Sequence, residues 1–211
     1  MTAAMGAAAM ARAIRERTMS CVEVLHACVA QLESQNPHLN AVVTVDLERA
    51  HALAELADRE LAQGRCSGPL HGLPFTIKDA YETAGLRTTC GHPPLADNIP
   101  SADAAVVTRL RAAGAIVLGK TNLPALAMDV QCESPVFGRT LNPWSDSHTC
   151  GGSSGGEAVA VACGMNAFGI GSDIGGSLRI PAHFCGIVGF KPTLDRWSNR
   201  GSQGAIKGQE V

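Results

Sequence analysis

Apolar residues recur every three or four positions in the first half of the chain, which is the spacing of helices. Residues Ser20 to Glu23 have the form S-x-x-E of a capping box and predict the start of a helix. We expect this helix to end before Pro37, because proline lacks the backbone N–H that a helix interior needs. The same spacing predicts a helix over 46–63, ended by Gly64, and another over 103–113.

Short apolar runs between these stretches predict buried strands, at 73–78, 115–118, 167–171 and 187–190. Two further short helices are predicted, over 157–163 and from Ser177 onward. Lys78 stands at the end of the first of these strands. Because helices and strands alternate along the chain, the sequence indicates an α/β fold.

Length and composition favour one domain. The chain has 211 residues, of which 45% are hydrophobic and 17% charged, which suits a single sizeable core. We therefore expect one α/β domain over 1–211, with an N-terminal arm at 1–19 and a polar, glycine-rich tail at 194–211. The net charge is −2 and lysine and arginine form no cluster, so nucleic acid is not expected as a partner.

The cysteines and histidines indicate neither disulfides nor metal. None of the eight cysteines forms a C-x-x-C pair, and several lie in apolar surroundings, which predicts reduced, buried thiols. The seven histidines lack metal-ligand spacing, so we expect no metal and no cofactor. Arginines follow rather than precede the apolar start of the chain, and no apolar run approaches about 18 residues. These features favour a cytoplasmic protein without a transmembrane segment.

Two glycine-rich turns carry the candidate chemistry. One runs from Cys150 to Glu157 and the other from Gly171 to Pro181, and their candidate serines are Ser153 and Ser177. Glycine costs about 0.5–1 kcal/mol relative to alanine in regular structure. Such a density is typical of sites where backbone N–H groups must approach a reacting atom. Two serines held in this way point to acyl transfer.

The second turn has the form of an oxyanion hole next to a nucleophile. The backbone N–H groups of Ile174, Gly175 and Gly176 precede Ser177, which we expect to attack a carbonyl carbon. A serine hydroxyl needs a base at neutral pH. His183 would point away along a helix, whereas Lys78 lies in an apolar strand where burial lowers the pKa of its amine. Ser153 could relay the proton from Ser177 to Lys78.

Five spaced motifs resemble those of the amidase signature family, namely His71–Asp79, Gly119–Pro124, Gly151–Gly156, Asp173–Ala182 and Gly189–Thr193. Within that family Glu157, Ile174, residues 184–186 and Gly208–Val211 are similar to the fatty-acid-amide-hydrolase branch. The resemblance implies a mixed central sheet flanked by helices. It also implies that members are about twice this length, so that the C-terminal half of the fold is missing here.

The resemblance also assigns roles. It implies that Lys78 is the base, Ser153 the bridging serine, often preceded by a cis peptide, and Ser177 the nucleophile. Asp173 and Arg179 would form an ion pair that braces the nucleophile loop, and their apolar setting favours a buried pair. The implied reaction is hydrolysis of a small-molecule amide to a carboxylate and an amine or ammonia, through an acyl-enzyme.

Several alternatives remain open at this stage. Gly151–Gly155 also fits G-x-S-x-G, which would make Ser153 the nucleophile of an α/β-hydrolase. The chain could instead be the subunit of a glutamine-dependent amidotransferase, or an inactive amidase-like fragment. A second copy or a partner chain could complete the fold. Ser154 is expected to be structural, and Cys150 to line the pocket wall or the core.

Overall fold

The structure, a computed structural model, describes residues 5–194 and 196–204. Its centre is a four-stranded sheet in the order β1-β3-β2-β8. Strand β3 (Ile116–Thr121) pairs antiparallel with β1 (Val42–Val45) and parallel with β2 (Pro74–Lys78). Strand β2 also pairs parallel with β8 (Phe168–Ile170). A mixed sheet within an α/β fold is confirmed.

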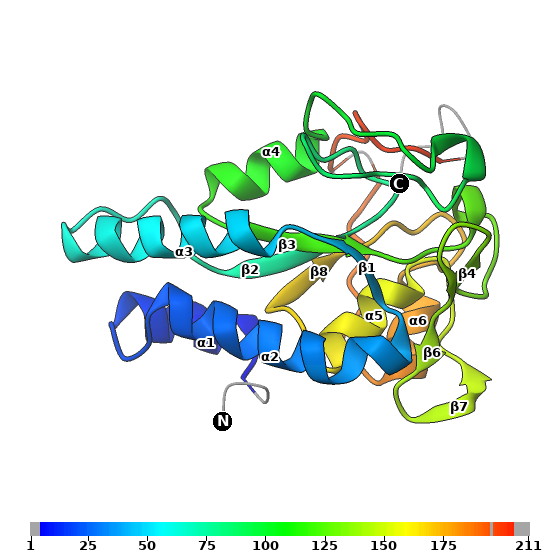
Figure 1. Ribbon diagram of the computed structural model, residues 1–211, viewed down its shortest axis with the longest axis horizontal. Helices are drawn as coiled ribbons and strands as arrows, with labels where there is room; N and C mark the ends of the chain where they lie inside the picture. The colour runs from blue at the N-terminus through cyan, green and yellow to red at the C-terminus, as the bar shows by residue number, and fades with distance from the viewer. Residues whose placement is uncertain (1–4, 195, 205–211) are drawn as a thin grey trace.

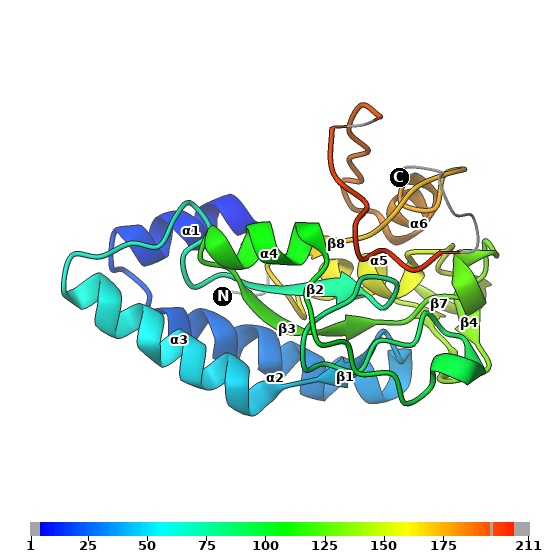
Figure 2. The same ribbon diagram turned by 90° about the horizontal axis from the view of Figure 1, so that it is seen from above.

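Helices cover both faces of this sheet (Figure 1). Helix α4 lies on one face, over β2 and β3 (Figure 2), and α1, α2 and α5 lie on the other. Helix α3 packs along α2. The helices are α1 (Ala7–Arg15), α2 (Cys21–Leu39), α3 (Leu47–Ala62), α4 (Ala105–Ala112), α5 (Gly155–Ala162) and α6 (Arg179–Cys185), with 3₁₀ turns at Pro93–Leu95 and Ala125–Ala127.

The main core lies between the sheet and the α1, α2, α3 and α5 helices. Its centre includes Ile14, Leu25, Leu118 and Val159, all buried. A smaller core lies on the α4 side, where the ring of Phe75 stacks on that of Phe168 with centroids 5.3 Å apart. Because successive strand residues point to opposite faces, β3 contributes Ile116 and Leu118 to the main core and Val117 to the smaller one.

The capping box at the start of α2 is confirmed. Ser20 Oγ accepts a hydrogen bond from Glu23 N at 3.0 Å, and Glu23 Oε2 accepts one from Ser20 N at 2.8 Å. The carboxylate of Asp58 on α3 accepts from Cys21 N and Val22 N. These bonds satisfy N–H groups that the first turn of a helix leaves free, and they tie α2 to α3.

The predicted end of α2 is wrong. The helix includes Pro37 and continues to Leu39, where Asn40 takes the left-handed conformation with φ of 51°. The side chain of Asn36 accepts from Ala41 N and Val42 N, and Leu39 is buried in the core. Packing of Leu39 and the cap by Asn36 outweigh the hydrogen bond lost at proline, which lies only one turn from the end.

The helices predicted over 46–63, 103–113 and 157–163 and three of the strands are confirmed within a few residues, as α3, α4, α5, β2, β3 and β8. Glycines end two of the helices as expected, with positive φ of 77° at Gly64 and 92° at Gly114. The last short helix, α6, begins at Arg179, two residues after the expected start at Ser177.

The strand predicted at 187–190 does not form. Residues 188–190 have no regular secondary structure, and Val188 and Phe190 are 94% and 73% exposed. An apolar run becomes a strand only where a neighbouring strand pairs with it. Strand β1 was not predicted, nor were two small hairpins in a segment interpreted as irregular. These hairpins pair β4 (Glu133–Ser134) with β5 (Gly138–Arg139), and β6 (Leu141–Asn142) with β7 (Ser145–Thr149).

The two end segments pack against the rest of the chain. Residues 7–15 form α1, whose Met10 and Ile14 are buried in the main core. In the tail, Gly201 O accepts from Glu82 N and Gln203 N donates to Ala80 O, so the tail packs against the segment after β2. The motif at 208–211 lies outside the described residues.

All eight cysteines lie in the described part of the chain and carry free thiols, six of them buried. Among the helices that the structure describes, none combines the length and the apolar character needed to cross a bilayer.

Candidate active site

The candidate residues meet at one edge of the sheet. Strands β2, β3 and β8 run parallel, so their carboxyl ends point to the same side. Lys78 ends β2, Thr121 ends β3, and Ser172 follows β8 after one glycine. Helix α5 begins beside them, directly after Ser153 and Ser154 (Figure 1). Ligand sites of parallel sheets commonly lie at this edge.

Lys78 is fully buried and hydrogen-bonded to two hydroxyl groups. Its Nζ lies 2.6 Å from Ser153 Oγ and 2.8 Å from Ser172 Oγ. Burial lowers the pKa of Lys78 to about 8, because the ammonium form loses its hydration. An amine with this pKa can take up and release a proton near neutral pH.

The loop that carries Ser153 is held by glycines and by Ser154. The peptide bond between Gly152 and Ser153 is cis. Gly151 has a φ of 79°, and a side chain there would collide with the backbone of Pro181. Ser154 Oγ donates to Ser172 O at 3.1 Å and accepts from Ser172 N at 3.2 Å. These contacts dock the loop onto the end of β8 and support a structural role for Ser154.

Ser177 lies next to this loop but is not joined to Ser153 by a side-chain bond. Its carbonyl oxygen accepts from Ser154 N at 2.9 Å, and the residue is half-buried. Among the described residues, the Ser177 hydroxyl makes no hydrogen bond to Ser153 or to any other group. The structure therefore brings Lys78 and Ser153 together directly, and places Ser177 beside them through its backbone.

Asp173 organises the turn before α6. Its carboxylate accepts from Gly176 N at 2.8 Å, from Leu178 N and Arg179 N at 3.2 Å, and from two nitrogens of the Arg179 guanidinium at 2.9 Å. Burial of Asp173 raises its pKa, but these hydrogen bonds outweigh burial and hold the pKa well below its usual range.

The expectation of a buried ion pair is half wrong. Asp173 is buried, whereas the Arg179 side chain is 56% exposed. Arg179 can reach the carboxylate from solvent because the N-terminal turn of α6 lies at the surface. The pair therefore consists of a buried anion, held by three backbone N–H groups, and an exposed cation.

The expected oxyanion hole also differs at one position. Gly176 N donates to Asp173, so this N–H is not free to converge with those of Ile174 and Gly175. Ile174 and Gly175 are exposed, and a side chain at Gly175 would contact nothing within 4 Å. His183, the other base considered, is exposed on α6 and has no hydrogen-bond partner among the described side chains.

Comparison with protein families decides what the chain is related to. A family model described as Amidase matches residues 23–211. The chain belongs to the amidase family. A glutamyl-tRNA(Gln) amidotransferase subunit of Lachnospira eligens is 43% identical over 192 residues, which are 91% of this chain and 40% of that protein. Putative amidase AmiB2 of Mycobacterium tuberculosis is 44% identical over 209 residues, which are 98% of this chain and 44% of that protein.

Solved structures give the same result for the fold. Fatty acid amide hydrolase is 30% identical with a TM-score of 0.91, over 99% of this chain and 37% of that one. Native peptide amidase from Stenotrophomonas maltophilia is 35% identical with a TM-score of 0.89, over 94% and 42%. The resemblance to fatty-acid amide hydrolases is thus confirmed. This amidase-family chain spans less than half the length of the relatives it matches.

The sequence interpretation missed several groups of this candidate site. Ser172 was not considered, although it directly precedes Asp173 and a buried lysine requires hydroxyl or carbonyl acceptors. Thr76, Thr121 and the carboxyl group of Glu157 form a buried network below Lys78. The signal for this network was present, because polar residues stood at alternate positions of the strand that ends in Lys78.

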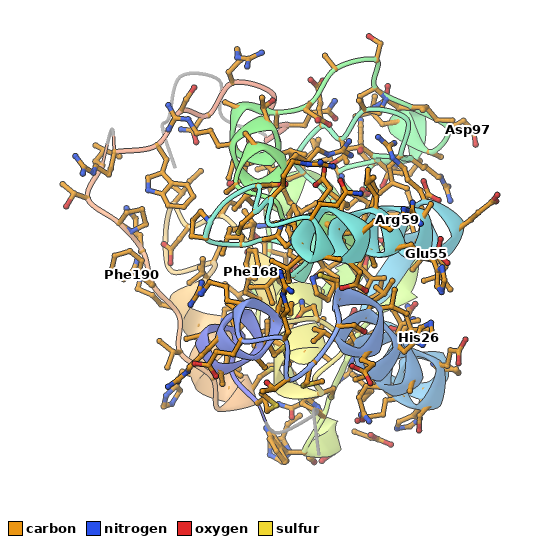
Figure 3. All side chains as sticks on the ribbon, turned by 90° about the vertical axis from the view of Figure 1, so that its left-hand side faces the viewer. His26, Glu55, Arg59, Asp97, Phe168 and Phe190 are labelled. Carbon is orange, nitrogen blue, oxygen red and sulfur yellow. The ribbon has the colours of Figure 1, made fainter. Side chains whose placement is uncertain are left out.

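A cavity of about 340 Å³ lies along β8 and is lined mainly by apolar side chains. Phe168 borders it toward the middle of the molecule, and Phe190 toward the margin (Figure 3). Ser172 and Asp173 also line it, so it adjoins the candidate site. In residues 5–194 and 196–204, no group of three or more histidine, cysteine or acidic side chains is arranged to hold a metal ion.

Proposed function

We propose that the protein is an amide hydrolase, which cleaves a small-molecule carboxamide to a carboxylate and an amine or ammonia. The observation that carries this proposal is the hydrogen bond of 2.6 Å between Lys78 Nζ and Ser153 Oγ, where both side chains are buried. A buried amine with a lowered pKa next to a hydroxyl group is a base for acyl transfer rather than a surface cation.

The proposed reaction uses three side chains. Ser177 Oγ attacks the carbonyl carbon, and its proton passes to Ser153 Oγ while the Ser153 proton passes to Lys78 Nζ. The backbone N–H groups of Ile174 and Gly175 stabilise the oxyanion. The proton returns from Lys78 through Ser153 to the leaving nitrogen, the C–N bond breaks, and water hydrolyses the acyl-enzyme by the same route.

Asp173 and Arg179 have a supporting part in this proposal. The three N–H groups that donate to Asp173 belong to the turn that contains Ser177, so the carboxylate fixes the conformation of that turn. Arg179 adds two charge-assisted hydrogen bonds from the solvent side.

A fluorophosphonate probe tests the assignment, because it reacts with activated serines. We expect one adduct by intact-mass spectrometry and, after peptide mapping, a modification on Ser177 that Ser177→Ala abolishes. Ser147→Ala, at an exposed serine of β7, is the matched control and should be labelled like the parent chain. An adduct on Ser153 would instead favour the nucleophile-elbow alternative, and a folded chain without any adduct would contradict the proposal.

A second candidate is the glutamine-hydrolysing component of an amidotransferase. The identity of 43% to an amidotransferase subunit favours it. Such a protein would release ammonia from glutamine, with the same serine and lysine chemistry, for use by a partner protein. Ammonia release from glutamine only in the presence of a partner would select this candidate, whereas partner-independent release from simple carboxamides would select the hydrolase.

We further propose that a partner polypeptide covers the β8 edge, either a second copy or another chain. Within the described residues β8 is paired on one side only, and the neighbouring Val188 and Phe190 are exposed. We expect a dimer in light scattering, or a monomer that binds a hydrophobic dye. A monomer without dye binding would contradict this, and dye binding with aggregation would favour the inactive fragment.

The free thiols support a reducing compartment such as the cytoplasm. We would compare chains purified with and without a reductant. Equal activity and equal thiol content in the two preparations would show that the protein does not depend on a reducing compartment.

A further inference from the structure

A carboxyl group is buried directly below the Lys78–Ser153 pair and has no part in the proposed reaction. Glu157 lies in the first turn of α5, four residues after Ser153, and is buried. Its Oε1 accepts from Thr76 Oγ1 on β2, and its Oε2 accepts from Thr121 Oγ1 on β3 at 2.7 Å. A buried carboxyl group is costly unless hydrogen bonds satisfy it, so a specific arrangement of this kind requires an explanation.

The sheet makes room for this carboxyl group at one position. Gly169 of β8 pairs with Thr76 of β2, and a Cβ atom at Gly169 would lie 2.6 Å from Glu157 Cγ. Glycine inside a strand commonly marks such a close approach. Asn166, just before β8, donates to Thr76 Oγ1 at 2.5 Å and to Glu157 Oε1 at 3.4 Å. Glu157 is therefore in contact with β2 and β3, and with β8 at the one residue without a side chain.

The contacts of Glu157 lie beside those of the candidate catalytic pair. Thr76 and Lys78 are two residues apart on one face of β2, which is about 6.6 Å along a strand. Ser153 lies in the loop two residues before α5, and Glu157 lies in the first turn of that helix. Two parallel contacts thus join β2 to this segment, from Lys78 to Ser153 and from Thr76 to Glu157. Thr121 adds a third, because it pairs with Lys78 across the strands.

We infer that Glu157 is a positioning residue for the proposed hydrolase: its carboxyl group clamps the first turn of α5 to Thr76 and Thr121, and this holds Ser153 in hydrogen-bonding distance of Lys78. The inference rests on the proposed function and adds a residue to it. Glu157 touches neither the substrate nor the reacting atoms in this account, and it acts through the register of α5 on the sheet.

The charge of Glu157 also affects the pKa of Lys78. Burial raises the pKa of Glu157 to about 7, against the hydrogen bonds from the two threonines. When ionised, the carboxylate favours the ammonium form of Lys78 and so raises the pKa of that amine, as the other anionic groups do. The other titratable or charged groups whose charge acts on Lys78 or Glu157 are Cys90, Lys120, Cys132 and Asp173.

Three variants separate the positioning role of Glu157 from the effect of its charge on Lys78. Glu157→Asp keeps the charge but shortens the side chain by one methylene, so that it cannot reach both threonines. Gly169→Ala keeps Glu157 but places a methyl group where its carboxyl group lies. Glu157→Gln keeps the length and removes the charge. Asp103→Asn is the matched control, since this carboxylate accepts from Ala84 N and lies 3.4 Å from Arg111, on the other side of the sheet.

The readout is the rate of fluorophosphonate labelling of the 211-residue chain between pH 6 and 10. We expect Glu157→Asp and Gly169→Ala to lower the rate tenfold or more. Glu157→Gln should lower it less and move the rise of rate with pH to lower pH, because the amine of Lys78 loses an anion. Asp103→Asn should leave both the rate and its pH dependence unchanged. Labelling of Glu157→Asp and Gly169→Ala at the parent rate would overturn the inference.

If the parent chain is not labelled, the proposed function is contradicted, but the positioning role of Glu157 is still open to test. A second measurement then tests that role without any labelling. The sequence has four lysines, so ¹⁵N-lysine NMR can follow Lys78 Nζ, identified by its loss in Lys78→Met. We expect Glu157→Gln to lower the pKa of Lys78 and Gly169→Ala to move its signal. If the Lys78 Nζ signal and the pKa of Lys78 are unchanged in both variants, the positioning role of Glu157 is overturned. If Glu157→Gln does not fold, the Lys78 signal of Gly169→Ala alone tests this role.

Discussion

Two lysines on neighbouring strands of the sheet are both buried but have different partners. Lys78 of β2 faces α5 and contacts the hydroxyl groups of Ser153 and Ser172. Lys120 of β3 faces the opposite side, where its Nζ lies 3.4 Å from the carboxylate of Asp79 and donates to Tyr81 O. Burial lowers the pKa of both amines to about 8, and for Lys120 the nearby carboxylate opposes this effect.

The difference indicates what each lysine does. Lys120 has an ion pair with a carboxylate and donates to a carbonyl oxygen, and both contacts favour its charged form and hold the segment after β2 in place. The hydroxyl groups around Lys78 can both donate and accept, so they satisfy the neutral amine as well as the ammonium form. A proton can therefore move between Lys78 and Ser153 without leaving a buried group unpaired.

The largest expected effect is that of Lys78→Met on activity. Without the proposed base, the rate of serine labelling at pH 7 should fall about 10²- to 10⁴-fold, and recover in part at high pH where hydroxide can act as the base. The free energy of unfolding should change by less than about 2 kcal/mol, since lost hydrogen bonds are offset by removing a buried amine. Urea denaturation beside the labelling assay checks both. If Lys78→Met is strongly destabilised but its folded fraction is labelled at the parent rate, Lys78 has the structural role that we assign to Lys120.

The opposite result is expected for Lys120→Met. Removing this partner leaves the buried carboxylate of Asp79 unpaired, which should lower the free energy of unfolding by about 3–5 kcal/mol. The labelling rate of the remaining folded protein should be close to that of the parent chain. Adding Asp79→Asn to Lys120→Met should restore part of the stability. If the double variant is as unstable as the single one, the ion pair is not the reason for the loss.

The smallest expected effect comes from removing one hydroxyl partner of each lysine, Ser172 for Lys78 and Thr88 for Lys120. Ser172→Ala removes an acceptor that favours the charged form of Lys78, so the pKa of this amine should fall and the rise of activity should move to lower pH. The shift should not exceed about one pH unit, which corresponds to about 1.4 kcal/mol. Thr88→Val removes the equivalent contact of Lys120 and should leave the pH profile unchanged. Equal shifts in both variants would remove the distinction between the two sites.

Much of this site could be predicted from the sequence because its signals are local. The glycine density around Ser153 and Ser177 indicated close backbone approach, and the structure shows it at Gly151 and Gly156. The position of Lys78 in an apolar strand predicted its burial, which the structure confirms. The capping box at Ser20 was equally local, since it needs only four residues.

Features that depend on distant partners could not be predicted in this way. The run 187–190 is apolar enough for a strand, but the described residues offer no strand to pair with it. Arg179 was expected to be buried with Asp173, yet its exposure depends on where the first turn of α6 meets the surface. Ser172 and Thr121 escaped notice because their roles come from strand pairing and from the packing of α5, not from neighbours in sequence.

The most direct test of Lys78 as the base is the pH dependence of serine labelling in the parent chain and in Lys120→Met. Only neutral Lys78 can accept the proton of Ser153, and the neutral fraction grows as pH rises through the pKa of about 8. We expect a rate that rises with pH around a midpoint near 8 in both proteins. A rate independent of pH in the parent chain, or a rise that disappears in Lys120→Met, would contradict this role of Lys78.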